Sequence, residues 1–395
     1  MKAVILAAGE GKRLKPFTET MPKVMLPIAN KPILEYVFDA CKRNGVEELI
    51  VVVGYKKEVI MEYFHDYQGI KITFIEQKNQ LGTAHALSTA KSYIDQPFIV
   101  LPGDNIIDDV SIAHLLNNPD DYILLIKEHH QPSKYGVVEV KDQYIQSIIE
   151  KPKKEASRFI STGIYKFPPT IFNLIEELQH QGSHALTPVI QTLLEKETKI
   201  HAIFADHWMD IVYPWDIIRA NESILQQMKM DVIQGTIEEG VTVKGPVFIG
   251  KNTKIYAGCY LIGPISIGEG CEIGPNTCIF PSTVIGNNSV VNAFSELRNS
   301  VVFSNVHIGS HASIAQTIIG QSTQIQNNFS SMSGETTIED EGEYVKLTDM
   351  GSIIGEDTTI KSHVVIDPGI IIGRAVHINS MKHINVPIPS KSKVM

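Results

Sequence analysis

The sequence predicts an α/β protein whose first part is a doubly wound, mostly parallel sheet and whose second part is a solenoid of stacked hexapeptide repeats. Up to about residue 216, short apolar runs alternate with helical stretches, the pattern of a parallel sheet that helices cover on both faces. From Val243 onward an aliphatic residue recurs at every sixth position, which fits neither the helical period nor a lone strand. The change of period separates two kinds of fold within one chain.

The first part contains four apolar segments that we expect to be strands, separated by segments that we expect to be helices. Ligands of parallel sheets bind at the carboxyl ends of the strands, so the turns that follow these strands are where chemistry is expected. The expected strands span residues 2–8, 48–54, 71–77 and 97–104, and the expected helices span 32–45, 56–66 and 83–94.

The second part keeps its six-residue pattern with two interruptions. The register slips near residues 300–308 and breaks across 326–350, where a polar and acidic insertion is expected to form a loop at one corner of the solenoid. We therefore expect a first domain at 1–216, a linker helix at 217–232, and a solenoid domain at 233–395. The first positions in register are Val243, Ile249, Ile255, Leu261, Ile267, Ile273, Ile279, Ile285, Val291 and Leu297, and the pattern returns at Ile354, Ile360, Ile366, Ile372, Ile378 and Ile384.

The composition of the chain limits which kinds of partner it can bind. Its 395 residues carry a net charge of −9, with an isoelectric point near 5.9, so it lacks the broad basic surface that nucleic acid or an anionic membrane requires. The apolar run at residues 3–8 is too short for a signal peptide or a membrane span, and we expect a cytoplasmic protein. Cys41, Cys259, Cys271 and Cys278 form no CxxC pair, which favours reduced, packed thiols over disulfides or zinc.

The first expected strand runs into a glycine-rich turn with nearby cations, in LAAGEGKRLKPFTETMPKVMLPI (residues 6–28). The dinucleotide fingerprint G-x-G-x-x-G fails because Leu14 occupies its last position, and the P-loop fails because Arg13 stands where Ser or Thr is required. What remains is a turn that lets backbone N–H groups approach a phosphate, followed by an arginine and a lysine able to contact its oxygens. The pattern therefore indicates a site for an anionic ligand.

The string G-x-G-x-R-L-x-P-x-T-x-x-x-P-K resembles the signature of sugar-1-phosphate nucleotidylyltransferases. The resemblance implies transfer of a nucleotidyl group from a nucleoside triphosphate to a sugar-1-phosphate, with release of pyrophosphate. It also implies that Ala8, Gly9 and Gly11 contact the nucleotide. The residues that match the signature are Gly9, Gly11, Arg13, Leu14, Pro16, Thr18, Pro22 and Lys23.

Further motifs of the same family follow in order along the first 220 residues. By resemblance, Gln77 reads the pyrimidine edge of the base, and Gly82 and Thr83 close over base and sugar. The form GTAHA is more similar to UDP-N-acetylglucosamine pyrophosphorylases than to dTDP-glucose enzymes, whereas Ser161 stands where the acetylglucosamine enzymes usually carry asparagine. The resemblance assigns four residues to the sugar: Gly136, Glu150, Ser161 and Thr162.

Two carboxylates are candidates for a metal site. Asp104 follows the apolar run FIVLPG, and Asp210 lies in HWMDIVYPWD, which is similar to the family's WxD segment. Position alone would equally fit an Asx turn at Asp104, and it is the resemblance that assigns both residues to Mg²⁺. Two hard oxygen ligands suit a Mg²⁺ ion that also binds phosphate oxygens.

The implied reaction is attack of a sugar-1-phosphate oxygen on the α-phosphorus of the nucleoside triphosphate. The nucleophile is already ionised at neutral pH, so the enzyme needs positioning and charge neutralisation rather than a general base. By resemblance, Arg13 contacts the β and γ phosphates that leave, Lys23 lies near the α-phosphate, and Lys151 holds the sugar phosphate.

The combination of both parts is similar to bifunctional UDP-N-acetylglucosamine pyrophosphorylase/glucosamine-1-phosphate acetyltransferases. The solenoid then resembles the left-handed parallel β-helix of acyltransferases, which implies a homo-oligomer, a trimer through the β-helix. A second activity with acetyl-CoA would take His311 as its base, but Ser313 replaces the expected tyrosine, and QNNFSSMS replaces the usual GAGT segment. The alternative is that the solenoid serves assembly alone.

Several alternatives stay open from the sequence. A dTDP-glucose or GDP-mannose pyrophosphorylase would share these motifs, because a few side chains decide base and sugar. An acyltransferase whose first domain only docks substrate would need an intact acceptor site on the solenoid. A non-catalytic scaffold that binds an NDP-sugar is expected to have lost Arg13, Lys23, Asp104 or Asp210, and all four are present.

Overall fold

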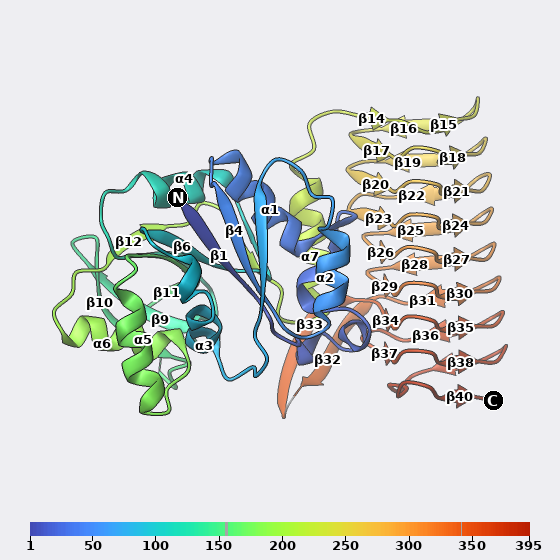
Figure 1. Cartoon of the computed structure of the whole chain (residues 1–395). Helices are drawn as coiled ribbons and strands as arrows, with labels where there is room; N and C mark the ends of the chain where they lie inside the picture. The colour runs from blue at the N-terminus through green and yellow to red at the C-terminus, as the bar shows by residue number, and fades with distance from the viewer. Residues whose placement is uncertain (155–156, 341) are drawn as a thin grey trace. The chain divides into compact units, whose positions relative to one another are not determined.

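The computed structural model describes residues 1–154, 157–340 and 342–395 (Figure 1). They form two compact units. Unit 1 comprises Met1–Glu10, Pro22–Met25 and Pro32–Asp210, and unit 2 comprises Gly11–Met21, Leu26–Lys31 and Ile211–Met395. Two short segments near the N-terminus thus belong with the C-terminal part of the chain, a grouping that differs from the division expected at residue 216.

Unit 1 is built around one sheet in the order β5-β4-β1-β6-β11-β8-β12-β10-β9. Its first four strands are parallel and agree with the expected strands. Side chains on both faces of the central strand are buried, as those of Val4 and Ile5 are, because both faces of the sheet are covered. The parallel strands are β1 (Lys2–Ala7), β4 (Glu48–Val53), β5 (Lys71–Glu76) and β6 (Phe98–Pro102).

Beyond β6 the sheet is mixed. Strand β11 runs antiparallel to β6, β8 and β9, while β8 and β12 are parallel to each other. Strands β9 and β10 form a hairpin whose two turn residues, Asp142 and Gln143, have φ angles of 51° and 69°, as tight hairpin turns require. These strands are β8 (Ile123–Glu128), β9 (Gly136–Lys141), β10 (Tyr144–Glu150), β11 (Phe159–Phe167) and β12 (His201–Phe204), and a separate pair is formed by β7 (Asn105–Ile107) and β13 (Trp208–Asp210).

Helices cover the sheet of unit 1. Side chains of α3, α5 and α6 share one core cluster with the strands, and α1 packs against α4. The expected helix at 83–94 is a shorter helix followed by a 3₁₀ turn, η4 (Lys91–Tyr93). The helices of unit 1 are α1 (Ile33–Arg43), α2 (Lys57–Tyr63), α3 (Thr83–Ser88), α4 (Asp109–Asn117), α5 (Ile171–His180) and α6 (Leu186–Glu195), and its other 3₁₀ turns are η3 (Lys23–Met25) and η5 (Pro132–Lys134).

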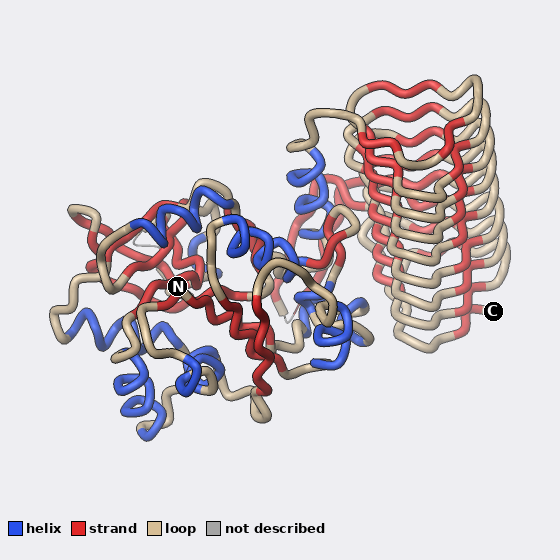
Figure 2. Tube along the Cα trace, turned by 45° about the horizontal axis from the view of Figure 1, so that its top comes forward, coloured by secondary structure: helices blue, strands red, loops and turns tan. Residues whose placement is uncertain are grey.

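Unit 2 contains a three-sided β-helix, in agreement with the expected solenoid. Parallel pairing joins each short strand to the strand one coil later: Val247 pairs with Ile265, and Ile265 with Thr283, an advance of 18 residues. Figure 2 shows the strands of successive coils in register. The aliphatic residues in the six-residue register point inward and form the core; Ile249, for example, is fully buried.

The three sheets of the β-helix are named by their first strands. The β14 sheet contains β14 (Val232–Ile233), β17 (Val247–Ile249), β20 (Ile265–Ile267), β23 (Thr283–Ile285), β26 (Val301–Val302), β29 (Ile318–Ile319), β34 (Ile353–Ile354) and β37 (Ile371–Ile372). The β15 sheet contains β15 (Thr236–Ile237), β18 (Lys254–Ile255), β21 (Glu272–Ile273), β24 (Val290–Val291), β27 (His307–Ile308), β30 (Gln324–Ile325), β35 (Thr359–Ile360), β38 (His377–Ile378) and β40 (Lys393–Val394). The β16 sheet contains β16 (Thr242–Lys244), β19 (Tyr260–Ile262), β22 (Cys278–Ile279), β25 (Glu296–Arg298), β28 (Ser313–Ala315), β31 (Ser330–Ser331), β36 (Val365–Ile366) and β39 (His383–Ile384).

The two interruptions in the repeat have structural causes. Val284 pairs with Val301 and Val301 with Ile318, so the coils advance by 17 residues here and the six-residue register slips by one. The insertion expected to be a loop is instead an antiparallel hairpin of β32 (Gly334–Asp340) and β33 (Glu343–Met350). Alternating Thr, Ile and Val residues inside this acidic segment suit a strand, which explains the error.

The expected linker helix at 217–232 is shorter in the structure. Helix α7 spans Asp216–Leu225, and β14 begins at Val232. Leu225 is buried, whereas Gln226 and most residues after it up to 234 are exposed. The helix therefore ends where its apolar face ends, because short helices depend on packing for their stability.

The remaining composition-based expectations concern thiols and membranes. All four cysteines are free, and Cys41, Cys259 and Cys271 are buried, as expected for packed thiols. Within the described part of the chain, every helix is too short or too polar to cross a membrane.

Unit 2 also includes two 3₁₀ turns and two small strands near the N-terminus. They are η1 (Lys12–Leu14), η2 (Phe17–Glu19), β2 (Pro27–Ile28) and β3 (Lys31–Pro32), the last of which ends in unit 1.

We predict that Ile273→Ala destabilises the β-helix by about 2–5 kcal/mol, because it leaves a cavity in a fully buried column of side chains. The exposed neighbour Glu272 gives a matched control on the same strand, and Glu272→Ala is expected to stay within about 0.5 kcal/mol of wild type. Urea unfolding followed by circular dichroism measures both changes. Equal effects of the two substitutions would contradict the assigned inside and outside of the coil.

Candidate functional site

Lys23 lies between two carboxylates in unit 1. Its Nζ atom is 2.6 Å from Oδ2 of Asp104 and 3.2 Å from Oδ1 of Asp210. The Lys23 side chain is only 14% exposed, so water and salt screen these ion pairs weakly. The structure thus brings together both of the residues expected to bind a metal and one of the expected catalytic cations.

Strand pairing positions the two carboxylates. Asp104 follows β6 at the carboxyl edge of the parallel strands, directly before β7. Asp210 ends β13, and in the β7–β13 pair it stands opposite Asn105. Lys23 begins η3 in the short stretch Pro22–Met25 that belongs to unit 1. Residues far apart in sequence therefore meet at the edge where parallel sheets bind ligands.

The electrostatic environment keeps Lys23 charged. Burial by itself would lower the pKa of this ammonium group, because it removes hydration. The negative charges of Asp104 and Asp210 and the hydrogen bonds to them outweigh burial and raise the pKa above its ordinary value. Lys23 is therefore a cation at neutral pH.

Of the two polar atoms in the Gln77 side chain, the amide nitrogen is hydrogen-bonded within the described residues. Its Nε2 group donates to the carbonyl oxygen of Gly82 at 3.2 Å and lies 2.9 Å from Nδ1 of His85. Since the Gly82 carbonyl can only accept, the atom facing it must be the amide nitrogen. Both amide hydrogens are thus committed within the protein, and Oε1 is the atom that Gln77 can offer to a ligand.

Gly82 and Thr83 attach the start of α3 to the segment that precedes α6. A Cβ atom at residue 82, where φ is 155°, would lie 2.5 Å from the carbonyl oxygen of His184. The Thr83 hydroxyl accepts a hydrogen bond of 3.0 Å from the N–H of Leu186, and the N–H of Ala84 donates to His184 at 2.8 Å. Both expected nucleotide residues therefore also have structural roles.

The turn after β1 combines close packing with an open glycine. The carbonyl oxygen of Ala8 accepts a hydrogen bond of 3.1 Å from the N–H of Tyr55. A Cβ atom at Gly9, by contrast, would meet no atom within 4 Å, and its φ is not in the left-handed region. Neither packing nor backbone conformation requires glycine at position 9, which leaves room for a ligand to approach the backbone.

Gly11 and Arg13 belong to unit 2. Gly11 has a φ of 70°, the left-handed conformation that favours glycine, and precedes η1. Its carbonyl oxygen accepts hydrogen bonds from the Leu14 N–H at 3.0 Å and from the Thr18 hydroxyl at 2.9 Å. These bonds fix the turn that carries Arg13.

The residues expected to contact the sugar fall into two groups. In the first, the Thr187 hydroxyl donates to Oε2 of Glu150 at 2.9 Å, and a Cβ atom at Gly136 would lie 3.3 Å from that same oxygen. Gly136 therefore leaves space for the Glu150 carboxylate. Lys151 is exposed, has a φ of 43°, and donates its backbone N–H to Tyr135 at 2.9 Å.

The second group lies on β11. The Thr162 hydroxyl is buried and donates to the carbonyl oxygen of Leu125 at 2.7 Å, while the Thr162 carbonyl accepts from Asn105 at 3.1 Å. The Ser161 hydroxyl lies 3.3 Å from the Tyr165 hydroxyl and is partly exposed. Ser161 is thus open to a ligand, whereas the Thr162 side chain is committed to Leu125 and the Thr162 backbone carbonyl supports the position of Asn105 beside the carboxylates.

The structure adds three polar side chains that the motifs alone did not assign: His85, His184 and Trp208. His85, in GTAHA, holds Gln77 as described above. Nδ1 of His184 and Nε1 of Trp208 are buried and have no hydrogen-bond partner among the described residues. The ring of Trp208, in the WxD segment, packs edge-on against Tyr135 at 5.9 Å. An unpaired buried polar atom is costly, so both atoms are candidates for contact with a ligand.

His311 lies in unit 2, at the exposed turn before β28. Its φ of 58° is left-handed, and its ring stacks on Phe294 with centroids 5.2 Å apart and 6° between the planes. Phe294 is itself 56% exposed. The structure thus places the candidate acetyltransferase base on a solvent-exposed corner.

Comparison with known proteins identifies similar chains. Residues 2–227 match the family described as Nucleotidyl transferase, and residues 261–349 match the GMPPB C-terminal domain. The chain is 36% identical over 385 residues to "Bifunctional protein GlmU" of Methanococcus maripaludis (strain C5), which covers 94% of this chain and 92% of that protein. It is 39% identical over 238 residues to "UTP--glucose-1-phosphate uridylyltransferase AglF" of Haloferax volcanii, which covers 58% of this chain and 98% of that protein.

A solved structure agrees with these matches. The structure of a UDP-glucose pyrophosphorylase complexed with UDP-glucose superposes with a TM-score of 0.52 and 25% sequence identity, covering 57% of this chain and 98% of that chain. The expected nucleotidyltransferase fold of the first part is confirmed. The resemblance drawn from the sequence motifs is confirmed as well.

We predict that Gly82→Ala lowers stability by about 1–3 kcal/mol, because the added methyl group meets the His184 backbone. Gly9→Ala is the matched control, and its stability is expected to stay within about 0.5 kcal/mol of wild type, since the new Cβ meets open space. Thermal unfolding of both variants measures the difference. A stable Gly82→Ala protein would show that the contact with His184 is not required.

Proposed function

The chain belongs to the sugar-1-phosphate nucleotidyltransferase family, and on this premise we propose that it transfers a uridylyl group from UTP to glucose-1-phosphate or N-acetylglucosamine-1-phosphate. The products are the UDP-sugar and pyrophosphate. The observation that carries the proposal is the Lys23–Asp104–Asp210 cluster at the carboxyl edge of the sheet. It supplies a cation and two hard oxygen ligands where two polyanions would have to meet.

The two carboxylates fit a magnesium ion. Mg²⁺ usually takes only one or two carboxylates from the protein and completes its shell with water and phosphate oxygens. Among the described residues there is no cluster of three or more His, Cys, Asp or Glu side chains suited to a metal. Asp104 and Asp210 would hold the ion, which when bound neutralises negative charge on the phosphates.

The chain's own cations perform the rest of the chemistry in this proposal. Lys23 lies near the α-phosphate, where its ammonium group supplies one positive charge. Arg13 contacts the β and γ phosphates, whose oxygens gain charge as the bond to the α-phosphorus breaks, and Lys151 binds the sugar phosphate. The attacking oxygen is already ionised, so no residue has to remove a proton.

Gln77 supports a uracil or thymine base. Its Nε2 hydrogens are committed to Gly82 and His85, so its Oε1 acts as an acceptor. Uracil and thymine present an N3–H donor on their pairing edge, whereas cytosine presents an unprotonated N3 there. The similarity to a uridylyltransferase of 39% identity favours UTP over dTTP. GDP-mannose synthesis stays an alternative, because guanine also presents an N–H donor.

A second activity is supported by one observation. The relative called a bifunctional protein covers 94% of this chain, so the similarity includes the β-helix. Acetyl transfer from acetyl-CoA to an amino-sugar-1-phosphate, with His311 as base, is the corresponding candidate. The absence of the expected tyrosine at Ser313 weighs against it. Consumption of acetyl-CoA in the presence of glucosamine-1-phosphate, compared between wild type and His311→Ala, tests this candidate.

The proposal also includes assembly and location. The family resemblance implies that the chain forms a homotrimer through its β-helix. It also implies that this β-helix is left-handed. The cytoplasmic location remains a prediction from the sequence. Sedimentation of the full chain tests the trimer directly.

We predict that pyrophosphate release, measured with Mg²⁺ over a grid of UTP, dTTP, GTP, CTP and ATP against three sugar-1-phosphates, is greatest for UTP with glucose-1-phosphate or N-acetylglucosamine-1-phosphate. Arg13→Ala is expected to lower turnover by about a hundredfold or more, because it removes a donor to the leaving phosphates. A variant with nearly normal turnover would remove Arg13 from the mechanism. No activity anywhere on the grid would favour the non-catalytic scaffold.

We predict that Gln77→Glu raises the KM for UTP by about tenfold or more, since a carboxylate would face the Gly82 carbonyl without a hydrogen to donate. Gln146→Glu makes the same chemical change at an exposed position of β10 and is expected to leave KM unchanged. Steady-state kinetics with UTP as the varied substrate compares the two. An unaltered KM in Gln77→Glu would mean that this amide does not order the base site.

A further inference from the structure

Within unit 2, the glycine-rich segment Gly11–Met21 packs on one corner of the β-helix, between the β14 and β15 sheets. Phe17 of η2 is fully buried, and its ring lies 5.1 Å from the ring of Phe303. Phe303 occupies the position after the β14-sheet strand that is glycine in neighbouring coils, as at Gly286 and Gly320. One coil therefore replaces a glycine with an aromatic ring that contacts this segment.

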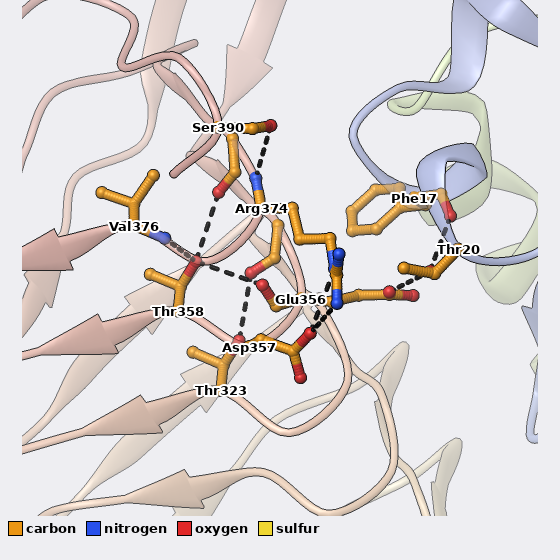
Figure 3. Close-up of polar contacts among 11 residues, drawn as sticks. Phe17, Thr20, Thr323, Glu356, Asp357, Thr358, Arg374, Val376 and Ser390 are labelled. Atoms are coloured by element: carbon orange, nitrogen blue, oxygen red, sulfur yellow. Dashed lines mark hydrogen bonds and ion pairs between the residues drawn. The ribbon is translucent and has the colours of Figure 1, made fainter. Parts of the chain in front are cut away.

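Two hydrogen bonds continue the contact along the same corner. The Thr20 hydroxyl bonds to Oε2 of Glu356, and Figure 3 shows these two side chains pointing toward each other. The Ser390 hydroxyl donates to Oε1 of Glu19 at 2.9 Å. Phe303, Glu356 and Ser390 belong to different coils, so the segment contacts the β-helix over several repeats.

Glu356 is unusual among residues at its repeat position. The equivalent residue in an earlier coil, Glu269, is exposed, whereas Glu356 is 5% exposed. The equivalence follows from the stacking: a Cβ atom at Gly250 would meet the Glu269 nitrogen, and one at Gly320 would meet the Glu356 nitrogen. Burial of this carboxyl group is thus a local feature, produced where Thr20 covers it.

The geometry around Glu356 suits a protonated carboxyl group. Its Oε1 atom is buried and has no hydrogen-bond partner among the described residues. The Thr20 hydroxyl has one hydrogen but two neighbouring acceptors, Oε2 of Glu356 and the Phe17 carbonyl oxygen at 3.4 Å. If the carboxyl group carries the proton, it donates to the Thr20 oxygen, and the Thr20 hydrogen is then available to Phe17.

The surrounding charges do not offset this burial. Arg374 directs its guanidinium to Oδ2 of Asp357, with distances of 2.6 Å and 3.0 Å. Burial is the main cause that raises the pKa of Glu356, the charges of Asp357 and Glu19 raise it further, and the bond from Thr20 and the charge of Arg374 lower it. The net direction is upward.

We propose that Glu356 is a positioning residue for nucleotide binding, in which its protonated carboxyl group holds Thr20 and thereby fixes the glycine-rich turn that carries Arg13. A short path connects them: two residues before Thr20, the Thr18 hydroxyl donates to the Gly11 carbonyl at 2.9 Å. Gly11 precedes Arg13 by two residues. The inference rests on the proposed role of this turn in binding the triphosphate, and it gives the β-helix a function in the nucleotidyl transfer itself.

The proposal has a defined pH dependence. Because the pKa of Glu356 is raised in the folded protein, the proton and its hydrogen bond are present at low pH and are lost as pH rises through that value. Ionisation would place an unpaired charge on the buried carboxyl group and weaken the contact with Thr20. Glu356→Gln keeps a hydrogen donor at all pH values, so the KM ratio of wild type to Glu356→Gln for UTP is expected to increase with pH.

The test uses the full chain and compares KM for UTP, KM for the sugar-1-phosphate, and hydrogen exchange of the backbone amides of residues 11–21. Glu356→Ala and Thr20→Val are expected to raise the KM for UTP by about tenfold, with faster exchange in 11–21, because each removes one partner of a buried hydrogen bond. The KM for the sugar-1-phosphate is expected to stay unchanged. Glu356→Gln and Thr20→Ser retain the bond and are expected to resemble wild type, as is the matched control Glu269→Ala.

Several results would overturn the inference. They are an unchanged KM for UTP with unchanged exchange in both Glu356→Ala and Thr20→Val, an equal effect of Glu269→Ala, or a Glu356→Gln variant as impaired as Glu356→Ala. If Glu356→Ala does not fold, the comparison of Thr20→Val with Thr20→Ser tests the inference. Absence of wild-type activity with every nucleotide would reject the proposed function instead, and hydrogen exchange would still show whether Glu356 orders the segment.

Discussion

The candidate site is built on one buried ammonium group, that of Lys23, which lies between the carboxylates of Asp104 and Asp210. Two carboxylates this close would repel each other without a cation between them, and the ammonium would be costly to bury without them. The β7–β13 pair and the turn after β6 fix the carboxylates, and η3 fixes the lysine. The same arrangement gathers three charged side chains at the carboxyl edge of the parallel strands.

The β-helix contributes more than a stack of coils. Its 18-residue period lets one corner present the same positions many times, and single residues at two adjacent repeat positions create a specific surface there: Phe303 in place of glycine, and Glu356, one position later in its own coil, buried beneath Thr20. The rest of the solenoid needs only inward aliphatic residues to fold. Corner residues can therefore vary, and contact the glycine-rich segment, without changing the packing of the core.

The predictable part of this protein follows from local or periodic signals. Six-residue spacing predicted the coils, and apolar runs predicted the parallel strands. The hairpin at 334–350 was missed, because its acidic composition outweighed the alternation of Thr, Ile and Val in the expectation. The family resemblance assigns Thr162 to the sugar, and the structure adds a hydrogen bond from its hydroxyl to the Leu125 carbonyl oxygen. Thr20 and Glu356 are 336 positions apart, so neither local segment of the sequence contains a pattern that predicts their contact.

Formation of a nucleotide sugar at the Lys23–Asp104–Asp210 cluster can be followed directly. Phosphorus NMR of a mixture of the full chain, Mg²⁺, UTP and N-acetylglucosamine-1-phosphate or glucose-1-phosphate follows every phosphorus atom at once. We expect equal growth of the UDP-sugar and pyrophosphate signals, and we expect this growth to stop when Lys23, Asp104 or Asp210 is replaced. Unchanged UTP, or hydrolysis of UTP without a UDP-sugar signal, would contradict the proposed function.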